Sequence, residues 1–105
     1  MYKQQIIEAI QNQEWLRTTF RREKDNTYVT RDVASYDVFP QESGERKGED
    51  RLLGFTAAHE DYQPGIISCY LNDIQSVTQT GEHFDGPTIQ RLINPKRPFY
   101  ISRNW

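Results

Sequence analysis

The chain has 105 residues, of which 35% are hydrophobic and 12% aromatic, and its formal net charge is −2. This length fits one domain, and the aromatic share lets few side chains bury a large apolar area. The single cysteine, Cys69, excludes an internal disulfide and a cysteine zinc cluster. No apolar run approaches the roughly 20 residues of a membrane helix, and the start of the chain lacks a signal-peptide pattern. We therefore expect a cytoplasmic protein with no membrane partner.

The charges are unevenly distributed along the chain. Residues 1–85 hold nine basic and all fifteen acidic residues, a net charge of −6, whereas residues 86–105 hold four basic residues and no acids. The basic residues of this tail are Arg91, Lys96, Arg97 and Arg103. Such asymmetry occurs at nucleic-acid contacts, but it is more often a solvated face or a complement to the acidic part of the same chain.

The first two elements follow from a change of period. Apolar residues at positions 6, 7, 9 and 10 share one helical face, which predicts a short amphipathic helix over residues 3–12. From Trp15 onward, apolar and polar residues alternate, which is typical of a half-buried strand over residues 15–23. A Lys-Asp-Asn turn then leads to a β-rich stretch, predicted as strand at 28–38 and ended by Pro40.

Residues 41–50 are polar, include two glycines and lack an apolar anchor, so we expect a mobile surface loop that is dispensable for folding. The most apolar run follows, and it predicts a strand at 51–58 in which Gly54 marks a bulge or a close backbone approach. Two short strands are expected at 66–71 and 74–78, and Gly81 closes the strand-rich region.

The last part of the chain differs from the rest. Asp85 is placed to cap a short helix whose apolar face holds Ile89, Leu92 and Ile93. These residues and the aromatic groups of the last seven residues exceed what a small barrel core needs. They either cover an open face of the same domain or form an interaction surface, for example in a homo-oligomer.

Together these elements predict a mainly β (α+β) fold, an N-terminal helix followed by a small five-stranded SH3-like or Sm-like partly open barrel. Residues 1–84 would form this barrel domain, and residues 85–105 a C-terminal extension that packs on it or on a partner. An open α+β sheet covered by two helices is the competing architecture. The predicted core residues are Trp15, Phe20, Val33, Leu53, Phe55, Ile67, Leu71 and Ile74.

The order of elements resembles the WYL domain, a bacterial ligand-sensing module usually fused to a winged helix-turn-helix. The stretch IIEAIQNQEWLRTTF resembles the family's opening helix and strand, and TRDVASYDVF its Arg-x-Val segment, with Arg31, Val33 and Tyr36 matching. The run RLLGFTAAHE keeps the hydrophobicity of the Trp-Tyr-Leu strand without its letters, and CYLNDIQSVTQTGEHF resembles the closing stretch. The resemblance spans residues 6–84 and implies a regulatory or accessory domain.

One departure from the family concerns its ligand groove. Where the family presents basic residues, this chain has Tyr70 and Asp73, and a carboxylate there would repel phosphate. Binding of nucleotides or nucleic acid is therefore not implied at those two positions, and Arg31 is the matching basic residue. The candidate ligand-binding residues are Arg17, Arg31, Tyr36 and Tyr70.

Catalytic and metal sites are not expected. His59, Glu60 and Asp61 are consecutive, so in a strand they would point to opposite faces, and no metal-ligand spacing such as Cys-x-x-Cys is present. Cys69 lies in an apolar strand, where a cysteine is usually a small core residue. We expect no enzyme, no cofactor and no metal.

Two functions remain open. The first is a stand-alone WYL-like regulatory or accessory domain that binds a small ligand or a protein partner. The alternative is a nucleic-acid-binding small β-barrel that uses the hairpin from Arg17 to Arg31 and the basic C-terminal tail, because cations interleaved with aromatics hold single strands.

Overall fold

The computed structural model describes residues 2–93 and 99–105. An α-helix precedes four strands, a short 3-10 helix separates the fourth strand from the fifth, and a second α-helix follows. Among the described residues, no helix is long and apolar enough to cross a membrane. The elements are α1 (Lys3–Asn12), β1 (Glu14–Arg21), β2 (Tyr28–Pro40), β3 (Asp50–Thr56), β4 (Gly65–Tyr70), η1 (Leu71–Asp73), β5 (Ile74–His83) and α2 (Gly86–Ile93).

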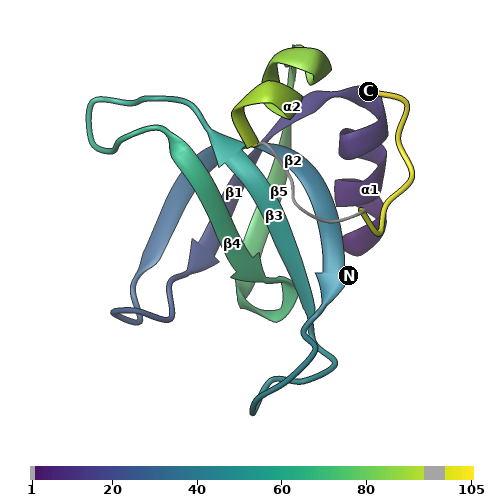
Figure 1. The fold of residues 1–105 in the computed structure, drawn as a ribbon. Coiled ribbons are helices and arrows are strands. Elements are labelled where there is room, and N and C mark those ends of the chain that lie inside the picture. Colours follow the sequence, from purple (N-terminus) through teal and green to yellow (C-terminus); the bar gives the residue numbers. More distant parts are fainter. Residues whose placement is uncertain (1, 94–98) are drawn as a thin grey trace.

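The strands form one antiparallel sheet in the order β4-β3-β2-β1-β5 (Figure 1). The long β2 belongs to both halves of this sheet, since residues 28–34 pair with β1 and residues 33–40 pair with β3. A register shift between Ser35 and Asp37 lies within the second half. The sheet coils strongly but does not close, which confirms the predicted partly open small barrel with an N-terminal helix.

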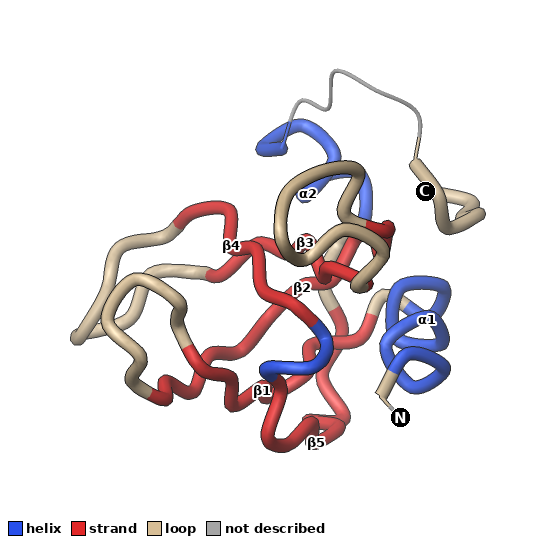
Figure 2. Tube along the Cα trace, turned by 90° about the horizontal axis from the view of Figure 1, so that it is seen from below, coloured by secondary structure: helices blue, strands red, loops and turns tan. Residues whose placement is uncertain are grey.

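The concave side of the sheet and α1 enclose the main core. The buried face of α1 presents Ile6, Ala9 and Ile10, which pack in one cluster with Leu16 and Leu52 from the strands. Figure 2 shows α1 beside the curled strands. Gly54 is required in this region, because a Cβ there would lie 2.2 Å from Cγ1 of Val33. The same Cβ would lie 3.3 Å from the backbone carbonyl oxygen of Ala34, and a register shift lies opposite this glycine, which confirms the predicted bulge or close backbone approach.

The other side of the sheet carries a second cluster under α2. It consists of Ala34, Tyr36, Phe84, Ile89 and Ile93, with Trp15, Leu53 and Phe55 packed against it. The predicted cap is confirmed, since Asp85 accepts a hydrogen bond from the backbone N–H of Thr88. Leu92 was expected on the buried face of this helix, but it is 54% exposed because Ile89 and Ile93 already fill the contact with the sheet.

The last residues of the chain return to the domain and lie beside α1 (Figure 1). Oδ1 of the buried Asp37 accepts the backbone N–H groups of Tyr100 and Ile101, both at 3.0 Å. The indole N–H of Trp105 donates to the carbonyl oxygen of Ile10 at 2.7 Å, and its ring packs edge-on against Phe84. We call Asp37 with residues 99–105 the C-terminal anchor.

Two predictions from the sequence need correction: which residues form the core, and where β5 ends. None of the eight predicted core residues is exposed, but five are half-buried, whereas Leu16 and Leu52 are fully buried and were missed. The sheet buries both faces, so alternation alone did not separate the main core from the second cluster. In addition, β5 does not end near residue 78 but continues to His83, and Gly81 lies within it at φ +79°.

Candidate ligand-binding groove

A groove of about 360 Å³ lies between β4 and the β1–β2 hairpin, and we call it the seam groove. One wall consists of residues 67–70 of β4. The other consists of residues 20–24, where β1 ends, together with Val29 and Arg31 of β2. Arg51 and Asp73 complete the lining. The groove thus lies along the edge of β4 that faces the β1–β2 hairpin.

The floor of the groove is apolar and its rim is basic. Phe20, Val29, Ile67 and Cys69 supply the apolar surface. The basic side chains of the lining are Arg21, Arg22, Lys24, Arg31 and Arg51, against two carboxylates, Glu23 and Asp73. Such a combination suits a ligand that has both apolar and anionic parts.

Three of the five basic groups have no acidic partner within the described part of the chain. Arg21 pairs with Asp73 and Arg22 with Asp25. In contrast, Lys24, Arg31 and Arg51 make no ion pair there, and these three charges are left to act on whatever occupies the groove. The guanidinium group of Arg31 instead stacks over the ring of Tyr62, 3.9 Å from its centroid. That of Arg51 donates to Oε1 of Gln41 at 3.0 Å and to Oγ of Ser68.

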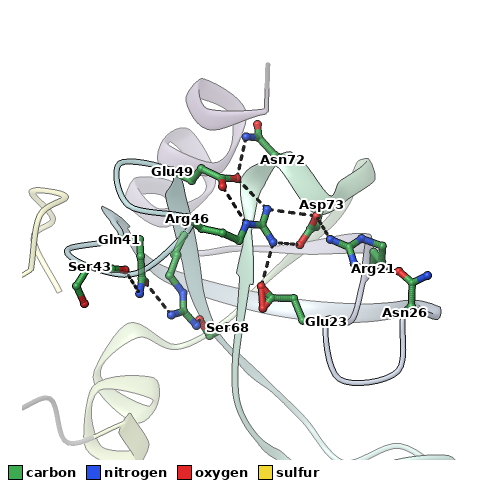
Figure 3. Close-up of polar contacts among 11 residues, drawn as sticks. Arg21, Glu23, Asn26, Gln41, Ser43, Arg46, Glu49, Ser68, Asn72 and Asp73 are labelled. Carbon is green, nitrogen blue, oxygen red and sulfur yellow. Dashed lines mark hydrogen bonds and ion pairs between the residues drawn. The ribbon is translucent and has the colours of Figure 1, made fainter.

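A cluster of charges centred on Arg46 shares Arg21, Glu23 and Asp73 with the groove lining (Figure 3). Its guanidinium contacts Glu49 at 2.8 Å, Asp73 at 2.9 Å and Glu23 at 3.0 Å. Arg21 reaches the same Asp73 from β1 at 2.8 Å. We call these five residues the Arg46 cluster. It joins the loop between β2 and β3 to the end of β1 and to η1, which already lie side by side because Phe20 pairs with Ile74.

The Arg46 cluster corrects the expectation for residues 41–50. A mobile loop was predicted there because these residues offer almost no apolar side chain to bury. The structure instead anchors this loop by charge, through Arg46 and Glu49. Backbone hydrogen bonds between Gln41 and residues 48–49 also close the loop. That the loop is dispensable for folding stays a prediction.

The pairing shifts the pKa values of the carboxylates in the cluster. Burial of Asp73 by itself would raise its pKa, but hydrogen bonds from Arg46 and then Arg21 hold the pKa below its usual value. The hydrogen bond from Arg46 likewise lowers the pKa of Glu49. The same hydrogen bonds, which Arg46 donates first to Glu49 and then to Asp73, raise the pKa of Arg46. All these groups are therefore charged at neutral pH.

This pairing changes how the departure from the WYL pattern is understood. The sequence analysis treated Asp73 as a free carboxylate that repels anions, but its side chain is 7% exposed and lies between two guanidinium groups. Tyr70 also has basic neighbours, since Arg46 stacks 3.7 Å and Arg51 5.0 Å from the centroid of its ring. This chain lacks basic residues at these two positions, and the basic groups found beside them come from the loop and from β3.

The four predicted binding residues are only partly brought together. Arg31 and Tyr70 both line the seam groove. Arg17 does not, and it forms a two-point ion pair with Asp32 on the neighbouring strand, at 3.0 and 3.2 Å. Tyr36 is 5% exposed and packs in the second cluster, edge-on against Phe99, so its ring is not available to a ligand in this groove.

Sequence reasoning missed Lys24, Arg51 and Arg46. Lys24 was read as part of a turn, and Arg51 as the start of a buried strand. No local signal distinguishes either of them from the many solvated charges of this chain. Of the basic tail, Arg103 stacks on Phe99 and Trp105, while Lys96 and Arg97 lie outside the described residues.

The residues weighed for catalysis or metal binding lie apart from the Arg46 cluster. His59, Glu60 and Asp61 are exposed and belong to the β3–β4 connection, where their ligand atoms lie within 4.8 Å of one another. The argument that strand geometry separates them therefore does not apply, but exposed acidic groups of this kind are common without a metal ion. Cys69 is on the groove floor, and burial raises the pKa of its thiol to about 12, which keeps it protonated and unreactive at neutral pH.

Comparison with known proteins relates the fold to a solved structure. No family model matches the chain, and no curated protein matches it. Among solved structures, the chain is similar to proteasome accessory factor B/C (PafBC) of Arthrobacter aurescens, with a TM-score of 0.62 and 17% sequence identity. The match covers 80% of this chain and 12% of that chain. At this identity the match shows a shared fold, and this chain corresponds to a small part of the PafBC chain.

Proposed function

We propose that this chain is a WYL-like regulatory or accessory domain that binds an anionic ligand or partner in the seam groove and catalyses no reaction. The observation that carries the proposal is the set of three basic side chains, Lys24, Arg31 and Arg51, which line an apolar groove and have no acidic partner among the described residues. Carboxylates neutralise Arg21 and Arg22, so Lys24, Arg31 and Arg51 give the groove its positive charge.

The fold supports this proposal in a general way. The similarity to PafBC relates the chain to a small part of a regulator, and domains of that kind act by binding. The groove supports it more directly, because an apolar floor with a few polar groups around it is the usual form of a small-ligand site. The neutral thiol of Cys69 on that floor adds apolar surface and no nucleophile.

Single-stranded nucleic acid is a second candidate. It is favoured by Tyr28, whose ring is 58% exposed on the same hairpin as Lys24 and Arg31 and could stack with a base. It is disfavoured by the ion pairs of Arg17 and Arg22, which neutralise much of the predicted basic surface of this hairpin. The groove thus supports an anionic ligand more strongly than an extended path for a phosphate backbone.

A titration of three labelled probes tests the proposal. Pyrophosphate, oligoglutamate and oligothymidylate would be added to the protein and to the double variant Lys24→Gln/Arg31→Gln at low and moderate salt. We expect at least one probe to bind the unmodified protein and to lose about tenfold or more in affinity in the variant. The matched control is Arg91→Gln, which removes a charge from α2, an element that does not line the groove. Equal binding by both variants, or no binding of any probe at low salt, would contradict the proposal.

A further inference from the structure

The two edges of the sheet differ in how well they are protected from further pairing. In the described part of the chain, β4 pairs with β3 alone, so its other side carries unpaired backbone groups. The sequence of β4, GIISCY, contains no charged residue and no proline, and Ile66 is 53% exposed. These are the features of an edge that can accept another strand. Charges, prolines and bulges are the usual protection, and β4 has none of them.

The opposite edge is protected in the usual way. The pairing of β5 with β1 is interrupted by two register shifts, and Gly81 lies within the strand at a positive φ. Glu82 and His83 add charged or polar side chains to its end. The exposed residues of β5 are almost all polar. A strand with these irregularities offers no continuous row of backbone groups, so the two edges are not equivalent.

The seam groove runs along the free edge of β4 and not over one of its faces. Four consecutive residues of this strand, 67–70, line the groove. Successive side chains of a strand point to opposite faces of the sheet. A cavity that contacts all four therefore lies along the side of β4 that no other described strand pairs with. The 360 Å³ space is thus in the position that a next strand would occupy.

The charges around the groove select among the strands that could enter it. Lys24, Arg31 and Arg51 would all lie close to an added strand, whereas the floor below it is apolar. A strand in which acidic and apolar residues alternate would place its carboxylates at these cations and its apolar side chains on Phe20 and Ile67. A second copy of this chain, paired through β4, would bring two sets of the same cations together, which electrostatic repulsion disfavours.

We infer that β4 accepts an extended acidic segment of a partner protein as an additional strand in the seam groove. This inference rests on the proposed function and names the partner class of the same site. Backbone hydrogen bonds to β4 would supply affinity, and the three unpaired cations would supply the preference for acidic side chains. A free small anion or a nucleic acid would use the cations without the strand edge.

Backbone methylation separates strand addition from binding by side chains alone. The probe is a short labelled peptide in which glutamate alternates with valine. Two derivatives carry N-methyl groups on alternate residues, one set offset from the other by one position, with all side chains unchanged. In an added strand, every second N–H points to its neighbour. One derivative should therefore bind at least about fivefold more weakly, whereas the other should bind like the parent peptide.

Hydrogen exchange gives a second measurement on the full chain. Bound parent peptide should slow the exchange of amide protons in β4, residues 65–70, more than in β5, the protected edge. If all three peptides bind equally and depend on Lys24 and Arg31, the inference is overturned and the proposed function stands. If oligothymidylate binds and no peptide does, the inference is overturned in favour of nucleic acid. If no anionic probe binds, both fail.

Discussion

Two regions of this protein attach a segment that the sheet itself does not hold, and they do so by different interactions. The Arg46 cluster attaches the loop between β2 and β3, and the C-terminal anchor attaches residues 99–105. In the first, side chains of opposite charge meet, and Glu23 of this cluster is 50% exposed. In the second, a carboxylate that is 1% exposed accepts two backbone N–H groups, and aromatic rings pack around it.

The difference predicts which conditions loosen each region. Ion pairs near the surface weaken with salt and with protonation of their carboxylates. Burial of an indole ring depends on neither of these. The seam groove lies beside the Arg46 cluster, so the part of the molecule that responds to salt and acid is also the part that we propose binds a ligand. The packing of Trp105 in the C-terminal anchor should therefore hold at both low and high salt.

The largest effect is expected at the C-terminal anchor. Trp105→Ala removes a ring that packs on Phe84 and a hydrogen bond to Ile10. We expect the free energy of unfolding to fall by about 3 kcal/mol, by the same amount at low and high salt. Urea denaturation at two salt concentrations measures this. Trp105→Phe keeps an aromatic ring and should lose clearly less. A loss below about 1 kcal/mol for the alanine variant would mean that the anchor contributes little.

A smaller and salt-dependent effect is expected in the Arg46 cluster. Arg46→Ala leaves Asp73, which is 7% exposed, with Arg21 as its remaining ion-pair partner among the described residues. We expect a loss of about 2 kcal/mol at low salt, decreasing as salt is added. Lys47→Ala is the matched control, since it removes the adjacent, exposed charge of the same loop and should leave the melting temperature nearly unchanged. Equal effects of the two substitutions would show that the loop is not anchored through Arg46.

A pair of glycines tests how tightly the anchor packs. A Cβ at Gly86 would lie 2.6 Å from Cγ of Trp105 and 2.5 Å from Oε1 of Gln13, whereas at Gly65 it would meet no atom within 4 Å. Gly86→Ala should therefore cost about 1 to 2 kcal/mol, although alanine favours a helix. Gly65→Ala should have little effect. Thermal unfolding of both variants measures the difference, and a stabilised Gly86→Ala would show that Trp105 moves aside without cost.

The comparison also shows what the sequence could and could not predict. The spacing of apolar residues along the chain predicted the helix, all five strands and the partly open barrel, because these depend on the local alternation of apolar and polar residues. Arg31 and Tyr70 were found through the family resemblance and do share one groove. The Arg46 cluster was missed because its members come from residues 21–23, 46–49 and 73, and spacing along the chain gives no sign that they meet.

Tyr36 shows a different limit. It lies in the predicted strand and matches the family segment, but the sheet has two buried faces, and alternation does not tell which of them holds a ligand. The side chain lies under α2, in the second cluster. Whether Tyr36 is covered depends on where the C-terminal elements pack. The sequence left open whether these elements pack on the same domain or on a partner.

The smallest effect is the acid dependence of the Arg46 cluster, and its sign follows from the direction of two pKa shifts. Hydrogen bonds with Arg46 hold the pKa of Glu49 below its usual value, and they lower that of Asp73 despite its burial. A carboxylate whose pKa is depressed in the folded state stabilises the protein above its unfolded pKa, about 4, and this contribution is lost as the pH falls through the folded pKa. Melting temperatures of the unmodified protein and of Arg46→Ala should therefore differ most at neutral pH and converge below about pH 4. The anchor variant Trp105→Ala is the control, because its deficit involves no ion pair and should persist in acid. The melting temperatures of the unmodified protein and of Arg46→Ala could instead differ by the same amount down to acid pH. That result would mean that Arg46 stabilises the protein by packing on Tyr70 and not by pairing with carboxylates.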